Sequence, residues 1–230
     1  MAGRTPKVNH VKKEFHREVN AARNLVSAID SLPRKARLNA ANGIHPKHVQ
    51  QIVELAFMGV VAAWEEFLER TLVRYVAGAS TDSHYSPSNK YGHANTINHA
   101  YEILSQDANY DPQKHYLKVS DSRWVWRTAD FYFNTHPYGC LSNKADLLKR
   151  ANLIRNRVAH GSAKCKADFK KTAIWFLQPQ NNQITQGYGP GALLLSSVQR
   201  HFGQPVINNN ASHFVAYLDL YESLSNQIVP

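Results

Sequence analysis

The apolar periodicity of residues 46–77 constrains the fold of this chain more than any other feature of the sequence. Pro46 suits the first position of a helix, and Gly78 suits the position just after its end. Between them, apolar side chains recur at spacings of three and four residues, as one face of a helix requires. These side chains are Val53, Phe57, Val60, Val61, Trp64, Leu68, Thr71, Leu72 and Tyr75. The pattern therefore predicts one long amphipathic helix.

Three further segments show the same periodicity. Residues 7–32 precede Pro33, residues 143–160 precede Gly161, and residues 210–228 lie near the end of the chain. The apolar face of residues 7–32 consists of Val8, Val11, Phe15, Val19, Ala22, Val26 and Ile29. That of residues 143–160 consists of Leu147, Leu148, Ala151, Ile154 and Val158, and that of residues 210–228 consists of Phe214, Tyr217, Leu218, Tyr221, Leu224 and Ile228. Four long helices with irregular material between them favour an all-α four-helix bundle with insertions.

The material between these helices is expected to belong to one domain, residues 1–230. Residues 79–142 are polar and rich in Tyr, His, Asn and Ser, which indicates a long insertion between core helices. Within it, "ANTINHAYEILSQ" predicts a short helix, whereas "SDSRWVWRTADFYFN" is compatible with a helix or a strand. Residues 162–208 are expected to be irregular, with "TAIWFLQ" and "NQITQGY" able to pair as a small β-hairpin and "GALLLSSVQRHF" able to form a short helix. The basic "RKARLNAANGIHP" predicts a loop.

The net charge of +10 and the isoelectric point of about 9.6 indicate a polyanionic partner such as RNA, DNA or an anionic membrane surface. The alternative is a basic protein whose charge only aids solubility. Cys140 and Cys165 form no CxxC pair, which argues against a zinc ribbon or a disulfide framework. The amino-terminal residues lack a secretory apolar region, and the apolar cluster 53–63 is too short to span a bilayer. We therefore expect a cytoplasmic protein without a membrane segment.

The stretch "ANLIRNRVAHG", residues 151–161, places an arginine among apolar positions. On an ideal helix Arg155 lies about 80° from Leu147, inside the apolar arc, whereas Asn156 and Arg157 lie on polar faces. A buried arginine must be paired or must line a cleft. Glu65 is a possible supporting residue, because apolar residues three, four and seven positions away place it at the edge of its helix's apolar face. The two side chains can form an ion pair, or both can extend to water at a helix rim.

His160 lies at the expected helix end, where the helix dipole by itself favours a cation. In this context "RNRVAHG" resembles the R-x4–6-H motif of HEPN domains, and Arg155, Asn156 and His160 match it. "AAWEEFLERTL" also resembles the long helix of free-standing HEPN families near the RiboL-PSP type. The resemblance covers the four-helix pattern and these two motifs, and excludes residues 79–142.

The resemblance implies an all-α bundle that forms a homodimer with two motifs in one cleft. Many HEPN proteins are metal-independent endoribonucleases in toxin–antitoxin, abortive-infection or CRISPR-linked defence systems, and others bind RNA or act as scaffolds. It therefore implies RNA as substrate, no cofactor and no metal, and an antitoxin or defence-system protein as a further partner. One subgroup carries a tyrosine two residues after the histidine. This chain has Ser162 there, so a nucleotidyltransferase-type antitoxin is less well supported.

The residue types suit RNA cleavage by the substrate's own 2′-OH. Such a reaction needs a base, an acid and cationic donors for the phosphate, which histidine and arginine supply. We expect Arg155 and His160 to be catalytic and Asn156 to orient His160 or the phosphate. Phosphate contacts are expected from Lys149, Arg150, Arg157 and Lys164, for which surface solvation is the alternative.

Two other clusters are weaker candidates. His84, His93 and His99 are near one another in sequence but lack the spacing of a metal site. A set of aromatic residues can stack on unpaired bases or, alternatively, pack in the core: Trp124, Trp126, Phe131, Tyr132 and Phe133. For the whole chain, the alternatives to an endoribonuclease are a non-catalytic RNA-binding module and a structural or antitoxin subunit.

Overall fold

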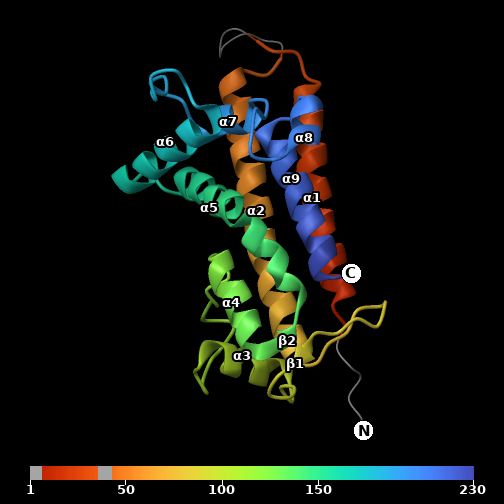
Figure 1. Ribbon diagram of the computed structural model, residues 1–230. Coiled ribbons are helices and arrows are strands. Elements are labelled where there is room, and N and C mark those ends of the chain that lie inside the picture. Colours follow the sequence, from red (N-terminus) through yellow and green to blue (C-terminus); the bar gives the residue numbers. More distant parts are fainter. Residues whose placement is uncertain (1–6, 36–42) are drawn as a thin grey trace. The chain divides into compact units, whose positions relative to one another are not determined.

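The computed structural model describes residues 7–35 and 43–230, and it is predominantly helical (Figure 1). Its elements are α1 (Asn9–Asp30), α2 (Pro46–Val76), β1 (Ser88–Asn89), α3 (Ile97–Ser105), α4 (Ser122–Tyr132), β2 (Phe133–Thr135), the 3-10 helix η1 (Pro137–Lys144), α5 (Ala145–Ala159), α6 (Ala163–Leu177), α7 (Pro190–Leu195), α8 (Gln204–Asn208) and α9 (His213–Ile228). The expectation of an all-α fold is confirmed.

The four long helices expected from apolar periodicity are all present as α1, α2, α5 and α9. Their observed bounds lie within three residues of the expected ones. Gly78 adopts a positive φ of +78° just after α2, and a Cβ there would come within 2.9 Å of the His93 ring. Glycine is therefore required at this turn. Part of the basic loop expected before α2, residues 36–42, lies outside the described residues.

The chain divides into two compact units. The first unit comprises Met1–Arg17, Ala63–Leu148 and Glu222–Pro230, and the second comprises Glu18–Ala62 and Lys149–Tyr221. Each unit has its own buried apolar side chains. The assignment of residues 1–230 to a single HEPN-like domain stays a prediction.

In the first unit, the carboxyl-terminal half of α2 is buried on several sides. Its covering includes Tyr138 of η1, a residue of the segment expected to be an insertion. The Tyr138 hydroxyl is fully buried and donates to Thr71 Oγ1 at 3.0 Å, and the Thr71 hydroxyl donates to the Phe67 carbonyl at 2.8 Å. The Tyr138 and Tyr75 rings meet edge to face, with centroids 6.3 Å apart. Residues 79–142 thus supply part of the core of this unit.

The structure defines two segments within residues 79–142 as helical over most of their length. "ANTINHAYEILSQ" contains α3, which confirms the short helix, and the Thr96 side chain caps its start. "SDSRWVWRTADFYFN" forms α4 and then β2, which pairs antiparallel with β1. Asp121 caps α4, and Val125 and Ala129 bury one face of it at a spacing of four. This cap and this spacing favour the helix over the strand.

The prediction of a β-hairpin within residues 162–208 is wrong. The prediction that this segment is irregular from its start is also wrong, because it begins with α6. "TAIWFLQ" belongs to α6, and residues 178–189 contain no strand. The Ser162 side chain caps α6 by accepting from the Cys165 N–H. The buried side chains of α6 follow helical spacing: Phe169, Thr172, Ala173 and Phe176. That spacing outweighs the local β-propensity of "TAIWF". Of "GALLLSSVQRHF", only the start is helical, as part of α7.

The second unit has a core of aromatic rings. Phe176 of α6 meets Tyr217 of α9 edge to face at 6.2 Å, and Tyr217 meets Phe57 of α2 at 5.3 Å. His213 is buried beside them, and burial lowers its pKa. No helix in the described part of the chain is long and apolar enough to cross a membrane.

We expect the buried tyrosine hydroxyl of η1 to contribute to stability. Tyr138→Phe should lower the free energy of unfolding by about 1 kcal/mol, because Thr71 loses a buried hydrogen-bond partner. Urea unfolding monitored by circular dichroism measures this. The matched control is Tyr116→Phe, since Tyr116 is 92% exposed, and it should change the free energy by less than about 0.5 kcal/mol. Equal effects of the two substitutions would contradict the role given to Tyr138.

Candidate functional site

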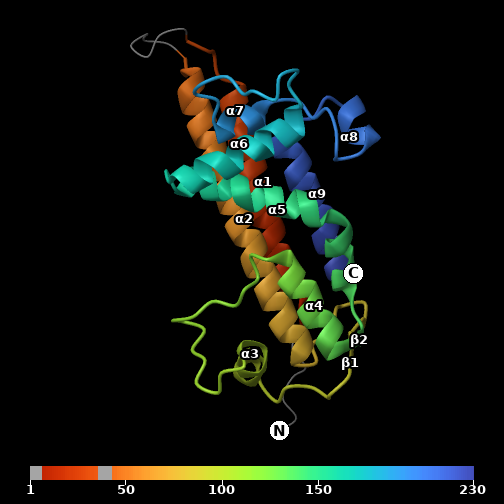
Figure 2. The ribbon, with the colours of Figure 1, turned by 60° about the vertical axis from the view of Figure 1, so that its left-hand side comes forward.

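The residues that match the HEPN motif lie where α5 ends and α6 begins, entirely within the second unit. The two helices lie side by side in both ribbon views (Figures 1 and 2). His160 and Gly161 connect α5 to Ser162, the cap of α6. Gly161 does not adopt the left-handed conformation of a typical helix stop. The turn instead ends α5 because Ser162 starts a new helix directly after it.

His160 is exposed and remains attached to the last turn of α5. Its N–H donates to the Asn156 carbonyl at 2.9 Å, so the two residues lie one turn apart. The Arg157 guanidinium donates to the His160 carbonyl at 3.4 Å. Arg157 is therefore partly engaged in capping the helix end, in addition to any contact it makes with a ligand.

Arg155 is partly buried, in agreement with its position at the edge of the apolar arc of α5. Its Nη1 donates to the side-chain oxygen of Asn156 at 3.0 Å. Of the five apolar residues expected to be buried on α5, four are buried and Val158 is only half-buried. The last turn of α5 thus comes to the surface, where a histidine and an arginine are accessible to a ligand.

Glu65, the proposed supporting residue, is a half-buried residue of α2. It belongs to the first unit, whereas Arg155 belongs to the second. Its participation in the site stays a prediction.

The four basic residues expected to contact phosphate differ in their surroundings. Lys149 and Lys164 are exposed, and Arg157 caps α5 as described above. Arg150 is half-buried: its Nη1 donates to Thr172 Oγ1 at 3.3 Å, and its guanidinium carbon lies 4.6 Å from the centre of the Trp175 ring. This cation–π contact and hydrogen bond join α5 to α6. The surroundings of Arg150 therefore indicate a structural role.

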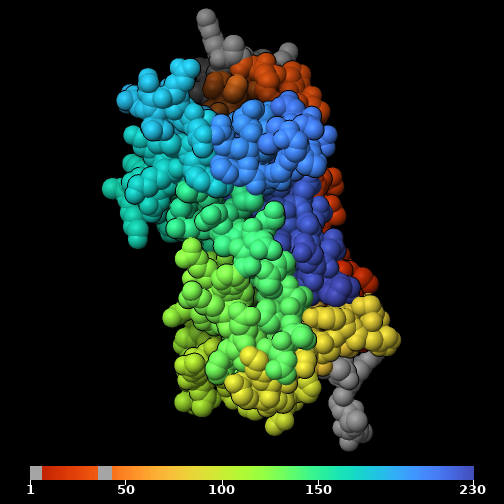
Figure 3. Space-filling model, in the orientation of Figure 1, coloured from red at the N-terminus to blue at the C-terminus, as the bar shows by residue number. Residues whose placement is uncertain are grey.

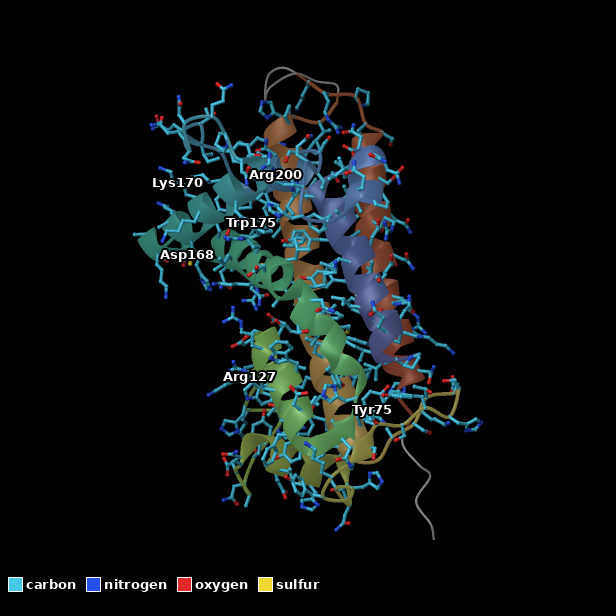
Figure 4. The ribbon with its side chains drawn as sticks, viewed as in Figure 1. Tyr75, Arg127, Asp168, Lys170, Trp175 and Arg200 are labelled. Atoms are coloured by element: carbon cyan, nitrogen blue, oxygen red, sulfur yellow. The ribbon has the colours of Figure 1, made fainter. Side chains whose placement is uncertain are left out.

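Sequence reasoning missed three lysines of α6, Lys166, Lys170 and Lys171, all of which are exposed. With Lys164 they outnumber the single acidic residue of that helix, Asp168. Lys170 and Asp168 are labelled in Figure 4. On a helix, Lys164 and Lys171 lie on the side away from the buried Phe169, whereas Lys166 and Lys170 lie at the edge of the buried face. The signal was the spacing "KCKADFKK", which could be interpreted only once residues 163–177 were known to be helical. The result is a positively charged helix beside His160.

Neither metal chemistry nor similarity to known proteins adds a further constraint on the site. Within residues 7–35 and 43–230, no group of three or more His, Cys, Asp or Glu side chains could hold a metal ion. The chain matches no protein-family model, no curated protein and no solved structure. The case for a function therefore depends on the residues and geometry of the chain itself.

The position of Arg150 leads to a stability prediction. Arg150→Gln should lower the free energy of unfolding by about 1–2 kcal/mol, because the contact with Trp175 and the hydrogen bond to Thr172 are lost. Thermal and urea unfolding measure the change. Lys149→Gln, at the exposed neighbouring position, removes the same charge and should change it by less than about 0.5 kcal/mol. If Arg150→Gln kept full stability and weakened RNA binding, Arg150 would be a phosphate contact instead.

Proposed function

We propose that this protein is a metal-independent endoribonuclease of the HEPN type, acting as a toxin or defence effector in the cytoplasm. The observation that carries the proposal is the arrangement at the end of α5. Exposed His160 lies one helical turn beyond Asn156, which is hydrogen-bonded to Arg155, and all three lie beside the lysine-rich α6. These are the residue types that RNA cleavage without a metal requires.

In the proposed reaction the 2′-oxygen of the RNA attacks the adjacent phosphorus, and the bond from phosphorus to the 5′-oxygen breaks. A base removes the proton of the 2′-OH, and an acid protonates the departing 5′-oxygen. His160 performs one of these transfers. Arg155 donates to the phosphoryl oxygens, where negative charge increases in the transition state. Asn156 acts as a positioning residue, because its side-chain oxygen accepts a hydrogen bond from Arg155.

The start of α6 supports phosphate binding at the same place. Ser162 already occupies the N–H of Cys165, which leaves the N–H groups of Ala163 and Lys164 directed out of the first turn. Such groups and the positive end of the helix dipole favour a phosphate. The four exposed lysines of α6 add electrostatic attraction that does not depend on sequence.

A single motif provides one histidine, yet the reaction needs an acid and a base. We therefore propose a homodimer in which two copies of the motif share one cleft, so that each copy supplies one His160. An antitoxin or defence-system protein is a further proposed partner.

A second candidate function is RNA binding without cleavage. The lysine-rich surface of α6 favours it, because that surface can hold a phosphate backbone without any catalytic group. If the protein only binds RNA, intact RNA should stay bound to it, with an affinity that falls steeply as the salt concentration rises.

The cleavage assay distinguishes the two functions. Wild-type protein incubated with a labelled RNA in EDTA should release fragments, whereas His160→Ala and Arg155→Ala should each cleave about 10²- to 10⁴-fold more slowly. The control is His48→Ala, which removes another exposed histidine, on α2, and should cleave at the wild-type rate. Equal cleavage by all proteins, or cleavage by none, would contradict the catalytic proposal.

The composite site requires a dimer in solution. Multi-angle light scattering at micromolar concentration should give twice the chain mass of 26.0 kDa. His160→Ala should give the same mass, because the substitution removes a catalytic group and leaves the helices intact. A monomer that cleaves RNA would show that one copy of the motif is sufficient.

A further inference from the structure

The first unit contains a cavity of about 460 Å³ between the end of α3 and one face of α4. Its volume lies within the range of about 300–1,000 Å³ that is typical of ligand sites. Leu104 of α3 lines it, as do Arg123, Trp124, Arg127 and Phe131 of α4. The chain between α3 and α4 makes a wide loop before it enters α4 (Figure 2). Residues 97–132 form a continuous part of the surface shown in Figure 3.

The face of α4 that lines this cavity combines positive charge with an exposed aromatic ring. Arg123, Arg127 and Phe131 follow at intervals of four residues and so share one side of the helix. Val125 and Ala129, on the other side, are buried in the core. Both arginines are exposed, and neither guanidinium forms a hydrogen bond or ion pair with any residue that the structure describes. Arg127 extends from α4 away from the ribbon (Figure 4).

Phe131 is 58% exposed, which is unusual for a phenylalanine ring. It lies beside Tyr91, which is 70% exposed, with ring centroids 5.6 Å apart. An aromatic pair that remains in water at the edge of a cavity costs free energy unless a ligand covers it. The pair therefore indicates a ligand with an aromatic or apolar face.

A second cavity, of about 410 Å³, shares Leu104, Gln106 and Trp124 with the first. Tyr110, Tyr116 and Lys118 line it from the loop between α3 and α4. Tyr116 is 92% exposed. The Tyr110 hydroxyl is buried and has no hydrogen-bond partner among the described residues. Trp124 stands between two adjoining cavities, each of which has an exposed aromatic ring and a basic side chain.

We propose that these two cavities bind two successive unpaired bases of single-stranded RNA, one on each side of Trp124. The bases stack on Phe131 and Tyr116. The phosphate between them and the next phosphate along the strand lie against Arg123 and Arg127. Single-stranded RNA presents both flat π faces and phosphates, and aromatic rings interleaved with basic groups are the usual means of holding it. In duplex RNA the bases are stacked and paired, so they cannot enter the cavities. The choice of RNA as ligand rests on the proposed function.

The test measures binding separately from cleavage. All proteins carry His160→Ala, so that the RNA stays intact, and the probe is a fluorescent unstructured RNA of twelve nucleotides observed by anisotropy. Phe131→Ala should weaken binding about 5- to 150-fold, because one base loses its stacking partner, without changing the salt dependence. Arg123→Gln with Arg127→Gln should weaken binding and reduce the slope of log affinity against log salt by about 1.4.

The matched control removes two positive charges elsewhere in the same unit. Lys13→Gln with Arg17→Gln alters two exposed residues of α1 that lie outside both cavities, and the affinity should change less than twofold. Thermal unfolding of each variant checks that the fold is retained. A duplex of the same length should bind with an affinity that is independent of Phe131.

Three results would overturn the proposal. The α4 variants could bind RNA as tightly as the control, Phe131→Ala could weaken duplex and single strand equally, or millimolar free nucleotide could displace the RNA completely. The last result would assign the cavities to a mononucleotide. Loss of cleavage activity is judged separately, with wild-type protein in EDTA. Binding that depends on α4 in a protein that never cleaves would therefore refute the nuclease and support this site.

Discussion

The burial of the carboxyl-terminal half of α2 is the constraint on which the first unit depends. This half carries apolar side chains on several sides, among them Phe67, Leu72 and Val76. One neighbouring helix cannot cover a surface of that width, so several segments must. Two of the contacts that cover it are hydrogen bonds donated by tyrosine hydroxyls. Tyr75 donates to the Ile228 carbonyl at 2.8 Å, and Tyr138 donates to Thr71 at 3.0 Å. Burial raises the pKa of both tyrosines, so both hydroxyls stay protonated and keep these hydrogen bonds.

The same constraint explains why α4 presents a basic and aromatic face. Val125 and Ala129 are small enough to pack closely in the core, and they fix the rotation of α4 about its own axis. With that rotation fixed, Arg123, Arg127 and Phe131 must line the cavity beside α3. The aromatic residues of this segment, which the sequence could assign either to the core or to base stacking, differ in burial. Phe133 is buried, whereas Phe131 is exposed.

The long helices were predictable because their apolar side chains repeat over many turns, which makes the signal independent of any single residue. The error over "TAIWFLQ" has a physical cause. Its five central residues are all compatible with a strand when taken alone. The helical spacing of Ala173 and Phe176 is recognisable only together with Phe169 and the Ser162 cap, which lie outside this segment. The environment of Arg150 was not predictable either, since its partners Thr172 and Trp175 lie more than twenty residues away on a helix that the sequence did not reveal. The positions of Arg155, Asn156 and His160 at the end of α5 were predictable from periodicity and from the glycine and serine that follow.

The two proposed RNA sites would use the positive charge of the chain in physically different ways. On α6 the lysines are exposed, whereas Phe169, which lies among them in the sequence, is buried. Their attraction for a phosphate backbone would therefore be independent of base and of strandedness. On α4, arginines alternate with aromatic rings, and stacking adds a contribution that only an unpaired base can supply. Cleavage through the 2′-OH also favours unpaired RNA, because the attacking oxygen, the phosphorus and the leaving oxygen must come into line, which the rigid geometry of a duplex resists. A site that selects unpaired RNA by stacking would therefore supply the conformation that the proposed cleavage at His160 requires.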